Sequence, residues 1–84
     1  MNVTVRYFAS LRETLGHAES VELAHETIDV GALRDLLIAR SSVHAQALAR
    51  GRAIRTALDQ TLCDEAAMLR DGAEVAFFPP VTGG

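Results

Sequence analysis

The sequence predicts an α+β domain in which a mixed sheet wraps around one main helix. Apolar and polar residues alternate near both ends of the chain, which is typical of half-buried strands. Between them, residues 30–40 carry one apolar stripe with helical spacing. With 84 residues, 49% hydrophobic and 23% charged, the chain can close a single core. The order strand, strand, helix, strand, short strand, strand follows, with the first and last strands side by side in the centre.

The first two strands are predicted at residues 2–8 and 20–24. Their apolar side chains recur at every second position: Val3, Val5, Tyr7, Val21 and Leu23. This period places them on one face of a sheet. We expect the two strands to pair antiparallel.

Three helices are predicted, at residues 10–15, 30–40 and 42–50. Their N-terminal signals are Ser10 in capping-box spacing with Glu13, Asp29 one residue after the apolar Ile28, and Ser42. Glycine can end a helix because it adopts positive φ without strain, and Gly16 and Gly51 stand at the expected ends of the first and third helices.

The remaining strands are predicted at residues 53–58, around 62–63, and at 74–78. Asp59, Gln60 and Thr61 form the predicted turn into the short strand, and Asp71 with Gly72 forms another. The last strand must end before the two consecutive prolines, since proline cannot donate a hydrogen bond to a neighbouring strand.

Composition excludes several classes of function. Eight basic residues against eleven acidic ones give a net charge of −3, the opposite of a nucleic-acid binder. No window approaches the roughly 20 apolar residues of a membrane span, so we expect a cytoplasmic protein with no membrane partner. One cysteine, Cys63, cannot form an internal disulfide or supply a metal cage, and we interpret it as a small core residue.

The body of the chain lacks the usual catalytic constellations. The three histidines, His17, His25 and His44, are separated, and no two of them share a helix face at i,i+4. Ser41 and Ser42 are more typical of a helix cap than of a nucleophile, because no histidine with an orienting carboxylate is evident beside them. We therefore expect no bound cofactor, no metal, and no enzymatic activity of the chain by itself.

The C-terminal residues carry the functional signal. We predict a domain over residues 1–78 and a flexible tail over 79–84 whose two prolines hold its base extended, so that it projects roughly 20 Å at about 3.1 Å per residue. Gly83 and Gly84 have no Cβ and can enter a narrow channel, preceded by Val81 and Thr82. The alternative is an incidental frayed tail or a cloning remnant.

A free carboxylate at Gly84 suggests a specific chemistry. The group is ionised at neutral pH and is a poor electrophile. It can attack the α-phosphate of ATP to give an acyl-adenylate, which a sulfur nucleophile can open to a thiocarboxylate. This chain has neither a nucleotide-binding loop nor the nucleophile, so partners must supply both.

The sequence resembles the β-grasp sulfur carriers, and within them the small subunits of molybdopterin synthase. The matching segments are Val5-Arg6-Tyr7-Phe8-Ala9, Leu11-Arg12-Glu13, Gly16, Ala32-Leu33-Arg34, Asp59-Gln60 and Asp71 through Gly84. A final Gly-Gly alone would include ubiquitin-like modifiers and thiamine-pathway carriers. The closing Phe-Phe-Pro-Pro-Val-Thr-Gly-Gly is the specific part. The resemblance implies a ubiquitin-like β-grasp fold with about five strands on one main helix and short extra helices.

The resemblance also implies a reaction cycle. An adenylyltransferase similar to ubiquitin activators would use Mg-ATP to form the Gly84 adenylate, and a sulfur donor protein would lead to the thiocarboxylate. The tail would then enter the large catalytic subunit of a two-plus-two heterotetramer and pass its sulfur to cyclic pyranopterin monophosphate, forming the molybdopterin dithiolene. Three alternatives remain open: a ubiquitin-like protein modifier, a thiamine-pathway sulfur carrier and a plain interaction domain.

Period-two alternation points to a docking face. If the core strands turn Tyr7 and Phe77 inward, Phe8 and Phe78 face outward as neighbours, and Leu62 extends the patch. The family uses matching apolar positions to dock both partners. The alternative is that the helix at 43–50 or the loops cover these residues. Arg6, Arg12 and Arg55 are candidate rim contacts of this face, and the alternative for each is an exposed, solvated side chain. Asp59 in the adjacent hairpin stands where members of the family often carry asparagine.

Overall fold

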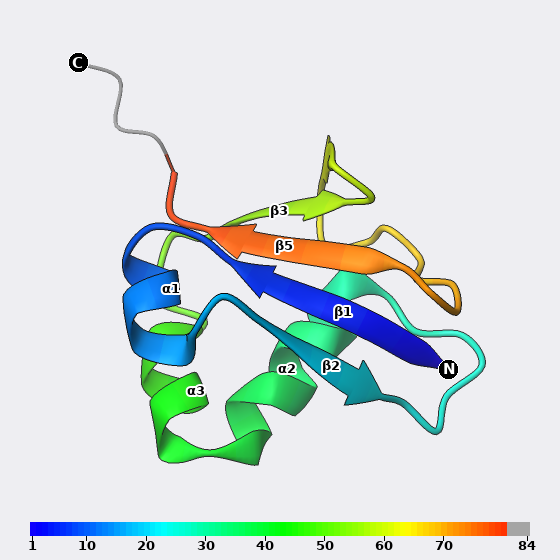
Figure 1. The fold of residues 1–84 in the computed structure, drawn as a ribbon, viewed down its shortest axis with the longest axis horizontal. Helices are drawn as coiled ribbons and strands as arrows, with labels where there is room; N and C mark the ends of the chain where they lie inside the picture. Colours follow the sequence, from blue (N-terminus) through cyan, green and yellow to red (C-terminus); the bar gives the residue numbers. More distant parts are fainter. Residues whose placement is uncertain (81–84) are drawn as a thin grey trace.

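The computed structural model describes residues 1–80; Val81, Thr82, Gly83 and Gly84 lie outside the described residues. The described chain forms five strands and three helices (Figure 1). In chain order they are β1 (Asn2–Tyr7), α1 (Ser10–Leu15), β2 (Ala18–Glu22), α2 (Val30–Arg40), α3 (Ser42–Ala47), β3 (Arg55–Leu58), β4 (Thr61–Cys63) and β5 (Glu74–Phe78). The strand and helix order predicted from the sequence is confirmed.

The strands form one mixed sheet in the order β2-β1-β5-β3-β4. β1 and β5 are parallel, whereas every other neighbouring pair is antiparallel. The expected central pairing of the first and last strands is thus confirmed, as is the antiparallel pairing of β1 with β2. β5 has a strand on each side, and therefore it cannot slip without disturbing two registers.

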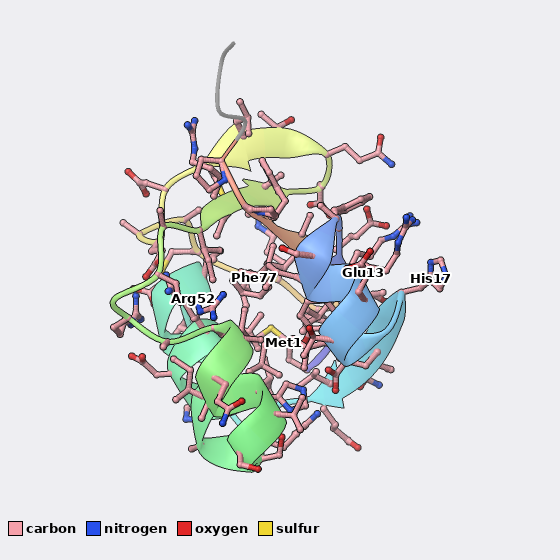
Figure 2. All side chains as sticks on the ribbon, turned by 90° about the vertical axis from the view of Figure 1, so that its left-hand side faces the viewer. Met1, Glu13, His17, Arg52 and Phe77 are labelled. Carbon is pink, nitrogen blue, oxygen red and sulfur yellow. The ribbon has the colours of Figure 1, made fainter. Side chains whose placement is uncertain are left out.

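All three helices lie on one side of the sheet (Figure 1). α3 contacts both α1 and α2. The space between the helices and the sheet holds the core, and its fully buried large side chains are Tyr7, Phe77, Leu33, Leu37, Leu48, Val3, Val5, Val30 and Val75. Figure 2 shows Phe77 in this interior, between the helices and the strands. The sheet face that turns away from the helices is described below.

The helix caps agree with the sequence only in part. Asp29 caps α2 as predicted, because its Oδ1 accepts a hydrogen bond from the Ala32 N–H at 2.7 Å. Ser41 rather than Ser42 caps α3, accepting from the His44 N–H at 3.1 Å. The predicted Ser10 capping box is wrong: Ala9 occupies the cap position of α1 and makes no side-chain cap hydrogen bond. Gly16 ends α1 at positive φ, as expected.

A buried guanidinium ends α3 earlier than the sequence predicts. The Arg34 side chain, only 4% exposed, donates from Nε to the Leu48 carbonyl oxygen at 2.8 Å and from one terminal nitrogen to the Ala49 oxygen at 2.7 Å. These carbonyls turn toward Arg34, and the Ala49 oxygen also accepts the Arg52 N–H at 2.9 Å in a three-residue turn rather than in a continuing α-helix. α3 therefore stops at Ala47, not at residue 50, and Gly51 does not end it.

The same guanidinium joins a network of charges. Arg34 donates to a Glu65 oxygen at 2.7 Å, and Arg50 pairs with the other Glu65 oxygen and with Asp35 at 2.9 Å. Burial alone would raise the pKa of Glu65, but the hydrogen bonds from Arg50 and Arg34 outweigh it and hold that pKa below its usual range. The network fixes the segment around Glu65 against the start of α2, where Gly31 donates its N–H to the Glu65 carbonyl oxygen.

A second network joins β1, β2 and α3 through Glu19. The Tyr7 hydroxyl donates to Glu19 Oε2 at 2.7 Å, His44 Nε2 lies 2.8 Å from the same oxygen, and Arg40 donates to Oε1 at 2.7 Å. Burial, followed by the Glu19 hydrogen bond, raises the pKa of Tyr7. For Glu19, burial opposes ionisation, but the hydrogen bonds from His44 and Tyr7 lower its pKa overall. Glu19 is therefore an ionised anchor between the sheet and α3.

Several strand limits differ from the sequence-based ranges. β2 covers residues 18–22 instead of 20–24, because its register against β1 begins with Ala18 opposite Arg6. β1 ends at residue 7 rather than 8, and β3 begins at residue 55 rather than 53. The ends of a strand depend on which residues of the neighbouring strands pair with it. The local alternation of apolar and polar residues does not predict this pairing.

Replacing Glu19 by glutamine tests the second network. A carboxylate whose pKa is lowered by folding contributes stability above its unfolded pKa and loses it as the pH falls through the folded pKa. We expect Glu19→Gln to lower the free energy of unfolding by about 1 to 2 kcal/mol at pH 7. Urea unfolding across pH 3 to 7 checks this: the stability of the variant should fall less steeply below about pH 4.5 than that of the wild type. Equal slopes would contradict the assigned role.

Candidate functional site: the outer sheet face and the base of the tail

The outer face of the sheet carries an apolar patch that crosses four strands. Opposed residues of paired strands project to the same side. One row of this face contains Arg6, Ala76, Ala57 and Leu62, which are successive partners across β1, β5, β3 and β4. The adjacent row contains Phe78 and its partner Arg55.

Phe8 completes the patch next to Phe78. It follows Tyr7, whose partner in β5 is Phe77, and its N–H donates to the Phe77 carbonyl oxygen at 3.2 Å. Tyr7 and Phe77 point inward and their rings stack at 6.3 Å between centroids. Phe8 and Phe78 therefore face outward, and the Arg6 guanidinium lies 5.6 Å from the Phe8 ring centroid. We call Phe8, Leu62, Phe78, Ala57 and Ala76 the outer patch.

No helix within residues 1–80 covers the outer patch. Phe8 is 39% exposed and Leu62 is 62% exposed, whereas Phe78 is half-buried. α3 lies on the opposite side of the sheet, where it packs against α1 and α2 (Figure 1). The geometry thus favours the exposed arrangement over the alternative in which residues 43–50 shield these side chains. The sequence pattern predicted the three large residues of the patch, Phe8, Leu62 and Phe78. The structure shows that the small side chains of Ala57 and Ala76 lie between them on the same face.

The base of the tail leaves the sheet beside the outer patch. β5 is the central strand and ends at Phe78, and Pro79 and Pro80 follow, both partly buried. The predicted tail residues Val81, Thr82, Gly83 and Gly84 are outside the described part of the chain. Pro80, the last described residue, therefore lies two residues along the chain from Phe78, which forms an aromatic pair with Phe8.

Asp59 lies in the hairpin between β3 and β4. Asp59 and Gln60 both have positive φ, at 48° and 69°, in a two-residue turn that joins paired Leu58 and Thr61. Asp59 Oδ1 accepts from the Glu74 N–H at 2.9 Å, and its own N–H donates to the Glu74 carbonyl oxygen at 2.8 Å. Both bonds need only a side-chain oxygen and a backbone amide, which asparagine also provides.

The other candidate groups lie away from the outer patch. His17 is at the surface beside α1 (Figure 2). His44 is held between Ser41 Oγ, 2.7 Å from Nδ1, and Glu19. The expectation that no histidine with a carboxylate stands beside Ser41 is therefore wrong. Glu19 is 22 residues before Ser41, and no local motif links them. Because Ser41 also caps α3, this arrangement supports the fold.

The described residues contain neither a metal-binding cluster nor a helix that could span a membrane. Within residues 1–80 there is no group of three or more His, Cys, Asp or Glu side chains placed to hold a metal ion. No helix in this part of the chain is long and apolar enough to cross a membrane. Cys63 is half-buried rather than fully buried, and its Sγ lies 3.6 Å from the Thr56 hydroxyl.

The topology and the site together define the class of protein: a ubiquitin-like β-grasp domain with an exposed sheet face next to a C-terminal tail. The modifier SAMP1 from Haloferax volcanii has the same fold, with a TM-score of 0.77, 24% identity and full coverage of both chains. A chain in the complex of subunits 1 and 2 of molybdopterin-converting factor from Helicobacter pylori 26695 gives a TM-score of 0.67 at 26% identity, also with full coverage of both.

The family is settled by the sequence comparison. The model of the ThiS family matches residues 5–84, and the chain belongs to this family. The molybdopterin synthase sulfur carrier subunit of Escherichia coli (strain K12) is 44% identical over 82 residues, which cover 98% of this chain and 99% of that protein. The resemblance identified from the sequence is confirmed.

The turn after Phe8 generates a prediction about strain. Ala9 has φ 54° and ψ −130°, a backbone conformation that favours glycine. We expect Ala9→Gly to raise the free energy of unfolding by about 1 kcal/mol, because relief of backbone strain exceeds the added entropy of the unfolded chain. Urea denaturation measures the change, and the control is Ala39→Gly at an exposed position of α2, which should be destabilising. If Ala9→Gly lowered the free energy of unfolding, the inference that the Ala9 backbone is strained would be wrong.

Proposed function

We propose that this chain is the sulfur carrier subunit of a molybdopterin synthase. The observation that carries the proposal is the full-length match to relatives of that name, which extends through the C-terminal Gly-Gly. The fold supports it, since a central strand leads directly to the tail and leaves an apolar face uncovered beside it. The chain is a carrier within an enzyme complex and supplies no catalytic side chain of its own.

The chemistry takes place at the Gly84 carboxylate. One carboxylate oxygen attacks the α-phosphorus of ATP, pyrophosphate leaves, and a glycyl adenylate forms. A sulfur nucleophile then attacks the carbonyl carbon and displaces AMP, which leads to a thiocarboxylate. Inside the synthase this group donates its sulfur to cyclic pyranopterin monophosphate, and two such transfers build the dithiolene. ATP and Mg²⁺ belong to the activating enzyme, and this chain binds no cofactor or metal.

Three partners follow from this cycle. The first is the large catalytic subunit, in a two-plus-two heterotetramer, and the solved complex of subunits 1 and 2 from Helicobacter pylori supports such a contact. The second is an adenylyltransferase of the ubiquitin-activating type, and the third is a sulfur donor protein. Docking of the large subunit uses Phe8, Leu62 and Phe78, while Val81, Thr82 and Gly83 thread toward its active site. The carrier acts in the cytoplasm, with no nucleic-acid or membrane partner.

Deletion of Gly84 tests the terminal chemistry. We expect the shortened chain to keep its melting temperature and to lose all support of molybdopterin synthesis, since the reactive carboxylate is displaced from its place in the large subunit. The wild-type chain, after incubation with the activating enzyme, ATP and a sulfur source, should gain the mass of one oxygen-to-sulfur replacement at its C-terminus.

Three outcomes would contradict the proposal. Retained synthesis by the shortened chain would show that Gly84 is dispensable. Heavier covalent conjugates without a thiocarboxylate would indicate a protein modifier instead. If the chain supplied sulfur for thiamine synthesis but not for molybdopterin synthesis, it would belong to the thiamine pathway.

Substitution of Phe78 tests the docking role of the outer patch. An arginine here places a charge in the apolar centre of the interface, and we expect the affinity for the large subunit to fall by at least about 30-fold, the factor for ~2 kcal/mol. Leu36→Arg is the matched control, because Leu36 is 41% exposed and belongs to α2 on the other side of the molecule. Titration calorimetry measures both, and thermal unfolding verifies that each variant is folded. Equal affinities for the two variants would refute the docking face.

A further inference from the structure

The outer patch lies between two arginines. Arg6 on β1 and Arg55 on β3 flank the central strand β5, with Arg6 opposite Ala76 and Arg55 opposite Phe78. Both occupy the two rows nearest the base of the tail. The carboxylate of Glu74 lies one row further away, opposite Thr4. Positive charge is therefore concentrated at the end of the face from which the tail leaves, although the whole chain has a net charge of −3.

Arg6 is held over the patch. Its guanidinium lies 5.6 Å from the Phe8 ring centroid, within the range of a cation–π contact. A Glu74 oxygen is 3.9 Å away, at the limit of an ion pair, and the Arg6 side chain is 45% exposed. An exposed pair at this distance contributes little, so the guanidinium keeps hydrogen-bonding capacity for another group.

Arg55 is exposed at the other border. Within residues 1–80 no ion pair or side-chain hydrogen bond involves it, although Asp64 and Glu65 line the same groove of about 540 Å³. Both carboxylates are engaged elsewhere: Asp64 accepts from the Ala66 N–H at 2.9 Å, and Glu65 is paired with Arg34 and Arg50. The guanidinium of Arg55 thus points to no partner among the described residues.

We propose that Arg6 and Arg55 select the large synthase subunit by its charge: the surface that docks on the outer patch carries carboxylates on both sides of an apolar centre. The inference rests on the proposed function and adds the chemistry of the partner surface. Apolar burial at Phe8, Leu62 and Phe78 stabilises the complex, whereas the two arginines steer its formation and orient the tail. Opposite charges placed at the rim act mainly on the association rate, and surfaces that bear basic residues at these points are rejected.

Charge reversal measures this role. We expect Arg55→Glu and Arg6→Glu each to lower the association rate constant with the large subunit of the same organism by about tenfold at low ionic strength, with a smaller change in dissociation. The difference from the wild type should shrink as salt rises to about 0.5 M, because screening shortens the range of the charges. Stopped-flow or surface plasmon measurements give both constants.

Three control variants test whether the effect depends on the position and the sign of the charge. Arg70→Glu alters the net charge by the same amount at an exposed turn before β5, far from the tail, and should leave association nearly unchanged. Arg6→Gln removes the charge without placing a second carboxylate beside Glu74, and it should show an intermediate rate. Arg55→Lys retains the charge and should keep most of the rate.

The outcomes separate the two proposals. Equal association rates for Arg70→Glu and for both border reversals would overturn the charge selection while leaving the docking face intact, provided that Phe78→Arg still weakens the complex. Faster association of the reversed variants would show a basic partner surface and would also overturn it. No binding by the wild-type chain would refute both the proposed function and this inference.

Discussion

The parallel pairing of β1 with β5 is the constraint on which the rest of the molecule depends. It joins the first strand of the domain to the last, and it fixes Val5 opposite Val75 and Tyr7 opposite Phe77. Because side chains alternate with a period of two, this single register decides at once which aromatics enter the core and which face outward. A shift by one residue would turn one of the two strands over, so that Tyr7 would share a face with Phe78, or Phe8 with Phe77. The same pairing places the last described residues in the middle of the sheet rather than at an edge.

The polar networks hold α2 and α3 on the other side of the sheet. Arg34 binds the carbonyl oxygens that follow α3, and Glu19 ties α3 to β1 and β2. Each buried donor in these networks has an acceptor, and within the described residues no buried side-chain polar atom lacks a partner. Both anchors therefore leave the outer patch uncovered. An apolar face of this kind, on a chain of 84 residues, is expected to be buried in a complex.

A division of labour between body and tail follows from this design. The body carries no metal-binding cluster within residues 1–80. In the proposed function it contributes a rigid docking surface and an anchor for the tail. The proposed chemistry requires from this chain only a carboxylate that other proteins can reach. In that cycle, the partner proteins supply the nucleotide-binding site and the catalytic groups. In the proposed complex, the apolar centre of the outer patch supplies the affinity. The charges at its borders alter the rate of encounter more than the strength of the complex.

The sequence by itself determined those features that depend on local chemistry. Period-two alternation at Val3, Val5 and Tyr7 identified β1, Asp29 identified the start of α2, and the two prolines fixed the end of β5. These signals are local because a strand face, a cap and a missing N–H each involve residues a few positions apart. The outward position of Phe8 and Phe78 followed from the same alternation.

Only the tertiary structure decided the features that join distant residues. The end of α3 is set by Arg34, which no motif connects to Leu48, and the role of Ser41 and His44 depends on Glu19 from another strand. The placement of Arg6 and Arg55 on either side of β5 likewise requires strands from opposite halves of the chain. Such contacts arise from sheet register and helix packing, which sum many weak interactions over the whole domain, and therefore no short segment of the sequence encodes them.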